Sequence, residues 1–376
     1  MITTRQRSRT TVTARPPLAV RPAVPLPDSV VDLSSGNPDP RLLPSLQEAV
    51  GSVDLPIRLY GETSVLPELR DLARVACDLA GIDRRVAVTS GGMDGLERVL
   101  LAHLKAGDQV ALEDPSYVGV LDLIRSMNLV PRSMPLDDSG VLPEAAEAAL
   151  AAGARAMIVT PRWQNPTGAA LSAERAADLR QILARFPSVL VVQDDHAGDT
   201  LSFAQENVVN GRARWAVVRS LSKVLGPDLR VGMVAGDALT VGRIEGRQAV
   251  GYGWVSHVLQ RLVAHMWSSP ITAQQVARAR ATYDARRQSL LDALAEFDIS
   301  AQGRSGYNVW IPVDAEEPVV RELLHRGWAT RAGEPYRLDS GPAIRVTTST
   351  LQPEDAGRFA ADLASVLHPH QQTRLG

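Results

Sequence analysis

Short apolar runs alternate with amphipathic segments from residue 86 to residue 240, and this alternation constrains the fold more than any other feature of the sequence. The runs are β-branched and apolar on both faces, which is typical of strands buried in a parallel sheet. Strand–helix alternation over this length predicts an α/β fold with a doubly wound, mostly parallel sheet. The expected strands are 86–88, 109–112, 156–159, 189–192, 216–218 and 233–235, and the expected helices are 95–104, 118–127, 143–151 and 172–186.

The chain is expected to consist of an N-terminal arm and one large folded unit. Residues 1–28 are dominated by Arg, Thr and Pro, and prolines at positions 16, 17, 22, 25 and 27 exclude a helix there. Within 29–376, a long helical stretch over about 255–296 precedes mixed strands and helices, which predicts a smaller α+β lobe. We expect a large lobe over about 50–245 and a small lobe over about 29–49 plus 246–376.

Composition excludes several classes of protein. A net charge of −2 argues against a chain whose main role is to coat nucleic acid or an anionic membrane. The single cysteine, Cys77, cannot form an internal disulfide, so a reducing compartment is expected. No apolar run approaches the roughly 20 residues of a membrane helix, and the basic N-terminus lacks the apolar region of a secretory signal. These features predict a soluble, cytoplasmic protein.

The segment from Arg219 to Arg230 carries the strongest chemical signal. Lys223 directly follows an expected strand, with Ser220 and Ser222 before it and Arg230 seven positions later. Lysine forms imines with aldehydes and is activated where its charged form is disfavoured. Hydroxyls and a guanidinium in the same turn make a phosphate clamp. An aldehyde beside a phosphate describes pyridoxal 5'-phosphate (PLP), although an exposed loop would carry the same residue types.

Two further segments stand at the ends of expected strands. Asn165, in Trp-Gln-Asn-Pro-Thr-Gly, belongs either to a plain Asn-Pro turn or to a site where it bonds the phenolic oxygen of a pyridine ring. Asp194, in Gln-Asp-Asp-His, is either a helix cap or solvated acid, or a carboxylate that keeps a pyridine nitrogen protonated. Open α/β sheets bind ligands at the carboxyl ends of their strands, so the three segments together favour a PLP site.

Two more turns fit this pattern. Gly91 and Gly92 lie between an expected strand and an expected helix, where glycines allow backbone amides and the helix N-terminus to receive a phosphate. A tight turn is the alternative. Tyr117 follows another strand and would lie flat on a ring face, whereas ordinary packing is the alternative for an isolated tyrosine.

Together these segments resemble the class I/II aminotransferases of PLP fold type I, from about residue 31 to about residue 367. The resemblance implies that Lys223 holds the cofactor as a Schiff base and that Asp194 bonds the pyridine nitrogen. It also implies that Asn165 bonds the ring oxygen and that Tyr117 stacks on the ring. The residues matching the phosphate cup are Gly91, Gly92, Met93, Ser220, Ser222 and Arg230.

The same resemblance implies a homodimer and an amino-acid or amine substrate. Tyr60 matches a tyrosine that reaches the phosphate in the partner subunit, and Arg345 matches an arginine that grips a substrate α-carboxylate. His196 stands where many relatives have a tyrosine that bonds the ring oxygen, and an imidazole there would be pH-sensitive. Gly92 and Met93 replace the Ser and Gln common in relatives, so the phosphate would depend more on backbone amides. No metal is expected.

Within that superfamily the chain is similar to the aminotransferase-like domain of MocR-type (GntR-type) regulators, in particular the vitamin-B6-salvage branch. The segments that carry this likeness are 33–40, 194–196, 215–220, 222–223, 226–230 and 254–257. Residues 3–12 resemble the wing hairpin that closes a winged helix, although a basic tail is the alternative. The recognition helix would then be missing from a truncated regulator, so we expect no sequence-specific DNA binding by this chain as written.

Two functions remain open from the sequence. One is an aminotransferase that moves an amino group from an amino acid to a 2-oxo acid through Lys223. The other is a sensor domain that binds PLP, or PLP plus an amine, and responds through a change in the shape of the dimer. The chain as written is expected to have no helix-turn-helix for DNA binding, which favours the enzyme slightly. The likeness to regulators favours the sensor.

Overall fold

The computed structural model describes residues 2–3, 11–12, 25–27, 29–76, 85–197 and 206–368. Cys77 and most of the expected arm over 1–28 lie outside these residues. Within the arm, β1 (Ile2–Thr3) pairs antiparallel with β2 (Thr11–Val12), in the segment that resembles a wing hairpin. A relation to such a hairpin, and the expected lobe boundaries, stay predictions.

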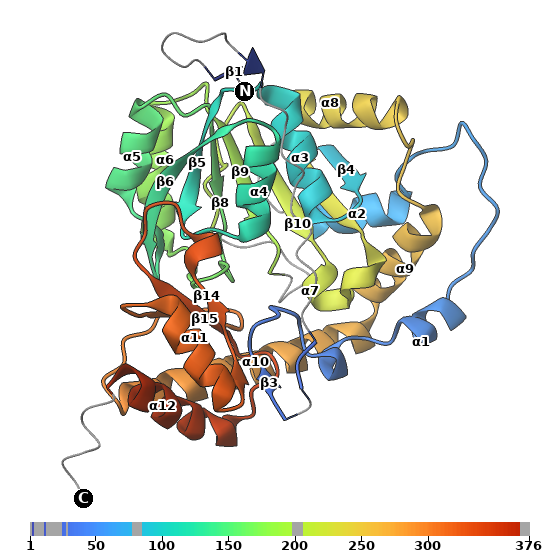
Figure 1. Cartoon of the computed structure of the whole chain (residues 1–376). Coiled ribbons are helices and arrows are strands. Elements are labelled where there is room, and N and C mark those ends of the chain that lie inside the picture. The colour runs from blue at the N-terminus through green and yellow to red at the C-terminus, as the bar shows by residue number, and fades with distance from the viewer. Residues whose placement is uncertain are drawn as a thin grey trace, which may run out of the picture.

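An eight-stranded sheet forms the centre of the molecule, in the order β4-β11-β10-β9-β8-β5-β6-β7 (Figure 1). Five neighbouring strands, β10, β9, β8, β5 and β6, run parallel, which confirms the predicted doubly wound, mostly parallel sheet. The strands are β4 (Arg85–Thr89), β5 (Gln109–Asp114), β6 (Val130–Asp137), β7 (Gly140–Val141), β8 (Ala156–Val159), β9 (Leu190–Asp195), β10 (Trp215–Ser220) and β11 (Gly232–Gly236).

Strand β11 is the exception among the expected parallel strands, because it runs antiparallel to both β10 and β4. Residues 221–231 join β10 to β11 through the short helices α7 (Ser222–Leu225) and η2 (Pro227–Leu229). A parallel return needs a crossover of a dozen or more residues, usually with a full helix. The short connection therefore reverses the strand and leaves Lys223 in the turn.

Helices cover both faces of the sheet because alternate strand residues point to opposite faces. On β9, Leu190 and Val192 pack with α3 (Gly92–His103), α4 (Val118–Ser126) and α8 (Ala238–Ala249). Val191 packs on the other face with α2 (Pro67–Ala76), α5 (Pro143–Ala151), α6 (Ala173–Ala184) and α9 (His257–Ser268). Apolar side chains on both faces of one strand explain its continuous apolar sequence.

Beside this layer lies a three-stranded sheet in the order β12-β15-β14, built from β12 (Asn308–Pro312), β14 (Arg331–Ala332) and β15 (Ala343–Thr347). Its core packs against α10 (Pro270–Ala295), α11 (Glu316–His325) and α12 (Pro353–Leu367). The remaining elements are β3 (Val31–Asp32), which pairs parallel with β13 (Trp328–Ala329), and the helices η1 (Pro40–Leu42), α1 (Leu46–Gly51) and η3 (Glu334–Tyr336).

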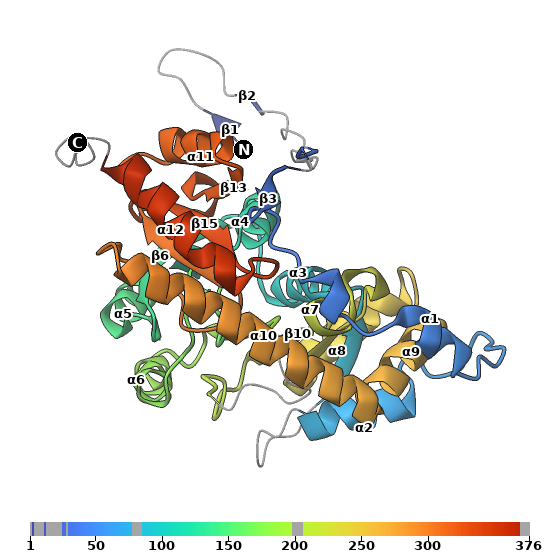
Figure 2. The ribbon, with the colours of Figure 1, turned by 90° about the horizontal axis from the view of Figure 1, so that it is seen from below.

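The expected helical stretch over 255–296 is helical in the structure, but it is divided into two helices that meet at Ser269. The side chain of Ser269 caps α10 by accepting from the Thr272 amide, and Pro270 occupies the first helical position. A proline inside a continuous helix would lose a hydrogen bond and clash with the preceding turn, whereas at the first position it costs neither. After this break α10 runs lengthwise from α9 to α12 (Figure 2).

Strand β6 was not expected from the sequence. It contains Pro131 and Pro135, and most of its residues are partly exposed. A strand near the sheet edge tolerates proline and polar side chains, so its sequence lacks the apolar run of the inner strands. In the part of the chain that the structure describes, no helix combines the length and apolarity that crossing a membrane requires.

Candidate active site

Lys223 lies in the turn after β10 and points toward the N-terminal segment of the chain. Its Nζ donates a hydrogen bond to the Gly36 carbonyl at 2.8 Å and lies 5.9 Å from the centre of the Tyr307 ring. Burial lowers the pKa of Lys223, and the nearby charge of Arg345 acts in the same direction. A small pocket has Lys223 in its wall, together with Trp163. The amine is therefore less firmly protonated than that of a surface lysine.

The expected phosphate cup is assembled around two glycines. Gly91 has a φ of +92°, and a Cβ on it would lie 2.7 Å from the Arg230 guanidinium. A Cβ on Gly92 would lie 3.0 Å from the Cβ of Ser220, whose Oγ is 3.2 Å from the Oγ of Ser222. Because neither glycine has a side chain, Arg230 and Ser220 can approach this turn more closely than a Cβ would allow.

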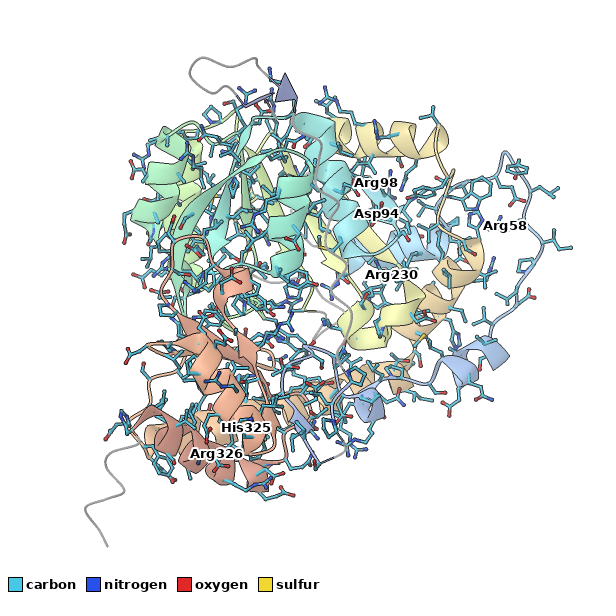
Figure 3. The ribbon with its side chains drawn as sticks, in the orientation of Figure 1. Arg58, Asp94, Arg98, Arg230, His325 and Arg326 are labelled. Atoms are coloured by element: carbon cyan, nitrogen blue, oxygen red, sulfur yellow. The ribbon has the colours of Figure 1, made fainter. Side chains whose placement is uncertain are left out.

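Helix α3 begins at this cup with free amide groups. No side chain caps it at Gly91, so the first amides of the helix, including that of Met93, have no acceptor within it. The side chain of Met93 instead packs against the apolar cluster on the face of the sheet covered by α3, α4 and α8. Figure 3 shows Arg230 beyond the amino end of α3, in line with Asp94 and Arg98. The first amides of α3 and the Arg230 guanidinium together fit a phosphate.

Asp194 and His196 lie together at the carboxyl end of β9. Nδ1 of His196 is 3.7 Å from Oδ2 of Asp194, and its Nε2 is 3.1 Å from the carbonyl oxygen of Trp163. Burial alone would lower the pKa of His196, but the hydrogen bond and charge of Asp194 outweigh it and raise the pKa. Both imidazole nitrogens therefore face protein groups.

Arg345, on β15, is a buried guanidinium that forms no ion pair with an acid of the described residues. It is 3% exposed, donates to Asn165 Oδ1 at 3.2 Å and to the Ser34 carbonyl, and lies 5.1 Å from the centre of the Tyr336 ring. Burial lowers the pKa of Arg345, and no described carboxylate contributes to it. A buried charge without a partner is costly, so this guanidinium fits an incoming carboxylate.

The two expected tyrosines have different surroundings. Tyr117 occupies the N-cap position of α4 and lies near Lys223 and Arg345. Tyr60 is 92% exposed in the segment between α1 and α2, and its ring meets Trp254 edge-on at 5.6 Å. Figure 1 shows this segment projecting away from the central sheet. Within one chain the structure brings Tyr117 to the site and leaves Tyr60 apart from it.

Sequence reasoning missed an ion-pair network beneath the site. Asp195 accepts from Arg219 at 2.9 Å and from Arg162 at 3.0 Å, and neither Asp195 nor Arg219 has any exposed side-chain area. Burial raises the pKa of Asp195, but the two arginines outweigh it and lower the pKa below its usual value. The sequence signal for this network was Arg219, an arginine inside the otherwise apolar strand β10. A buried charge requires a partner, so this residue indicates a buried ion pair.

Another missed residue is Glu113, at the end of β5. It is 3% exposed and accepts from the Thr160 amide at 2.7 Å and from Gln164 Nε2 at 3.3 Å. Burial raises the pKa of Glu113 to about 7, aided by the charge of Asp194. Gln164 also bonds Thr167 and the carbonyl of Pro115, so it ties the Asn165 turn to β5.

The fold and the site define the class of fold-type-I PLP-dependent transferases, in which a lysine after a strand faces a phosphate cup and a carboxylate-binding arginine. The chain belongs to the aminotransferase class I and II family, whose sequence model matches residues 28–363. This assignment confirms the family that the sequence motifs indicate.

Among curated proteins, the chain is 40% identical over 342 residues to the vitamin B6 salvage pathway transcriptional repressor PtsJ of Salmonella typhimurium. That match covers 90% of this chain and 79% of the repressor, and it confirms the likeness to MocR-type regulators. The chain is also 24% identical to the mitochondrial kynurenine/alpha-aminoadipate aminotransferase of Rattus norvegicus, over 91% of this chain and 92% of that protein.

Solved structures share the fold. A multiple substrate aminotransferase from Thermococcus profundus superposes with a TM-score of 0.80 at 20% identity, covering 92% of this chain and 93% of that one. LysN, an alpha-aminoadipate aminotransferase from Thermus thermophilus complexed with N-(5'-phosphopyridoxyl)-L-leucine, gives a TM-score of 0.76 at 24% identity, covering 91% of this chain and 93% of that one.

Proposed function

We propose that this chain binds PLP through Lys223 and transfers an amino group from an amino acid to a 2-oxo acid. The observation that carries the proposal is Lys223 itself, a lysine with a lowered pKa in the same site as Arg345, a buried guanidinium without a carboxylate partner among the described residues. One group offers an amine for the cofactor, and the other offers a charge for the substrate.

The described residues divide the work of holding PLP. Gly91, Gly92, Ser220, Ser222 and Arg230 would bind the phosphate, since the two glycines let the Arg230 and Ser220 side chains lie close to the turn before α3. Asp194 would hold the pyridine nitrogen, with His196 fixing its carboxylate. When bound, PLP supplies an electron sink for negative charge that develops at the substrate Cα.

The substrate would be held and deprotonated by the protein's own groups. Arg345 would bind the α-carboxylate through two parallel hydrogen bonds, for which a buried guanidinium is suited. Lys223 Nζ, released from the cofactor, would accept the proton from Cα, because its lowered pKa leaves a larger share of neutral amine. Asn165, already bonded to Arg345, would keep the guanidinium in place.

A homodimer completes this proposal. Tyr60 is too exposed to serve the site of its own chain, and Ile57, Leu59 and Val250 are exposed as well, at 90%, 68% and 87%. Exposed apolar side chains that gather in one region are typical of a protein interface. In a dimer, Tyr60 would reach the phosphate cup of the partner subunit.

The first test is an absorbance spectrum with PLP, because the chain has only two lysines, Lys105 and Lys223. We expect a visible band in the wild type and in Lys105→Ala, and none in Lys223→Ala. Conversion of the band to the pyridoxamine form by an L-amino acid, with release of a 2-oxo acid, would establish transamination. No band in the wild type would overturn the proposal.

A second candidate function is an effector-sensing domain of a MocR-type regulator. The 40% identity to a repressor of vitamin B6 salvage over 90% of this chain favours it. In that case the band would form and depend on Lys223, but no amino acid would convert it and no 2-oxo acid would appear. The same experiment therefore separates the two candidates.

A further inference from the structure

A buried carboxylate at the end of β5 binds a loop that belongs to the small sheet. Asp114 is 2% exposed, and both of its oxygens accept hydrogen bonds from the loop over 337–342, which joins η3 to β15. The amides of Leu338, Asp339 and Ser340 donate to it at 2.8–2.9 Å, and the Ser340 hydroxyl donates at 2.9 Å. Successive main-chain amides in a turn form a concave site for an anion. Here a carboxylate of the central sheet occupies that site.

The bonds to Asp114 are strong enough to fix the loop. A further donor, the Ser133 hydroxyl on β6, lies 2.8 Å from the carboxylate. Hydrogen bonds to an ionised acceptor are roughly twice as strong as those between neutral groups. The side chain of Leu338 adds apolar contact, since it packs on the cluster covered by α3, α4 and α8. The loop is therefore fastened to the central sheet, although the chain continues from it into the small sheet.

Tyr336 directly precedes this loop, and its ring lies beside Arg345. The ring centre is 5.1 Å from the guanidinium carbon of Arg345 and meets Trp310 edge-on at 6.2 Å. The Tyr336 carbonyl accepts from the Ser116 amide at 2.8 Å. Ser116 is two residues after Asp114, so the bonds on both sides of Tyr336 come from one short stretch at the end of β5. With only 3% of Tyr336 exposed, the ring follows its main chain closely.

The direction of the Arg345 guanidinium depends on such neutral neighbours. Its other partners are Asn165 Oδ1 and the Ser34 carbonyl, and neither carries a charge. An ion pair would hold a guanidinium in one orientation through two parallel bonds, but Arg345 forms none with a described residue. A shift of the Tyr336 ring would therefore turn the guanidinium away from the direction in which it meets a carboxylate.

We infer that Asp114 is a positioning residue for the substrate carboxylate. It fixes the loop over 337–342, the loop fixes Tyr336, and the Tyr336 ring holds Arg345 in the binding orientation. This inference rests on the proposed function, because it explains how the carboxylate-binding arginine of that site is oriented. Asp114 acts through Arg345 and not on the cofactor, so its loss should weaken carboxylate binding and leave PLP binding intact.

The test measures binding, so it does not depend on turnover. The whole chain with PLP added is titrated in a calorimeter with valerate and with 3-phenylpropionate, two unreactive carboxylates. In Asp114→Asn an amide group replaces one oxygen and faces N–H donors, so both ligands should bind about tenfold more weakly. The PLP affinity, measured from the Lys223-dependent absorbance band, should stay within about twofold. Ser340→Ala removes one hydroxyl donor and should weaken carboxylate binding by about two- to threefold.

Asp237→Asn is the matched control. Asp237 accepts from the amides of Trp215, Leu239 and Thr240 and from the Thr240 hydroxyl, beside the amino end of β10. Lys223 follows the other end of that strand. The control should lower the thermal midpoint by an amount comparable to that in Asp114→Asn, but it should bind both carboxylates as the wild type does. Weaker carboxylate binding in the control would attribute the effect to lost stability and would overturn the inference.

A double-mutant cycle tests the route through the ring. Tyr336→Leu should weaken carboxylate binding by itself, and adding Asp114→Asn should weaken it by less than about twofold more. Additive losses would show that Asp114 acts by another route and would overturn the inference.

Two further outcomes overturn the inference while leaving the proposed cofactor site intact. One is unchanged carboxylate affinity in Asp114→Asn, and the other is a wild type that shows the absorbance band but binds neither carboxylate. Failure of the proposed function has a different sign, which is the absence of a Lys223-dependent absorbance band in the wild type.

Discussion

At the scale of single residues, buried ion pairs stabilise the strand ends that carry the site. Asp195 and Arg219 are both without exposed side-chain area, and Arg162 joins them from the strand-to-turn segment that carries Asn165. Such a group tolerates loss of one member poorly, because the others remain buried without a counter-charge. Asp194 directly precedes Asp195 on β9, so its position depends on this network.

Replacing Asp195 with Asn should therefore cost about 3–5 kcal/mol of stability, since it leaves Arg219 buried without a negative partner. Urea-induced unfolding of the cofactor-free protein measures the change. The control is Asp137→Asn, whose carboxylate is 47% exposed and pairs with Arg175, and whose loss should cost about 1 kcal/mol or less. Similar losses for the two variants would contradict the prediction.

Glu113 gives a pH dependence whose sign follows from its raised pKa. The pKa is about 7 in the folded chain against 4.5 for a free glutamate, so the folded state holds the proton more tightly. Its contribution to stability is fully present below pH 4.5 and is lost as the pH rises through 7.

In Glu113→Gln this loss should vanish. The thermal midpoint of the variant, relative to that of the wild type, should rise between pH 5 and pH 8. Glu147→Gln is the control, because its carboxylate is 45% exposed and pairs with Arg185, and it should not show this rise. A constant midpoint difference for Glu113→Gln would show that the buried carboxyl does not titrate in this range.

At the scale of elements, the phosphate cup depends on the close approach of β11 to the turn before α3. A Cβ on Gly232 would lie 2.6 Å from the carbonyl carbon of Gly91 and 2.9 Å from the amide nitrogen of Gly92. Both are main-chain atoms, so they cannot move aside without shifting the strand or the turn. The missing side chain at Gly232 thus allows β11 to lie directly against the turn that forms the phosphate cup.

Gly232→Ala should destabilise the protein by about 1–3 kcal/mol and weaken PLP binding, because the turn must move away from β11. Gly242→Ala, on α8, has nothing within 4 Å of its added Cβ and should be neutral or stabilising by up to about 1 kcal/mol. Thermal unfolding and a titration with PLP measure the two effects. Unchanged PLP affinity in a folded Gly232→Ala protein would refute the predicted coupling.

At the scale of the whole molecule, one segment exposes large apolar side chains when the chain is considered alone. The segment between α1 and α2 exposes Ile57 and Tyr60, and it contacts the segment after α8 through Trp254. Arg58 extends from the same projecting loop, well away from Arg230 at the cup (Figure 3). In the proposed homodimer this loop would meet a second copy of the chain.

Ile57→Asp should shift the protein from dimer toward monomer and weaken PLP binding with it, since Tyr60 would no longer reach the partner subunit. Analytical ultracentrifugation gives the mass, and a PLP titration gives the affinity. Leu239→Asp is the control, because that residue is 52% exposed in the first turn of α8, where an acid suits the helix N-terminus. A wild-type monomer would rule out the dimer directly.

The sequence by itself determined the inner strands, about half of the α-helices and the residues at the strand ends, because a buried parallel strand requires a continuous apolar run and its turn carries the chemistry. It identified Lys223 and the glycines of the cup for this reason. Strand β6, next to the edge of the sheet, and the break at Ser269 were missed, since local patterns resembled a loop and a continuous helix.

Only the tertiary structure decided which distant residues share an environment. Gly36 accepts from Lys223 across 187 positions, and Asn165 accepts from Arg345 across 180. The register that sets Arg331 against Arg345 depends on the pairing of β14 with β15, and periodicity within either strand does not specify its partner. Contacts between remote segments arise from packing of the whole chain, so no local pattern contains them.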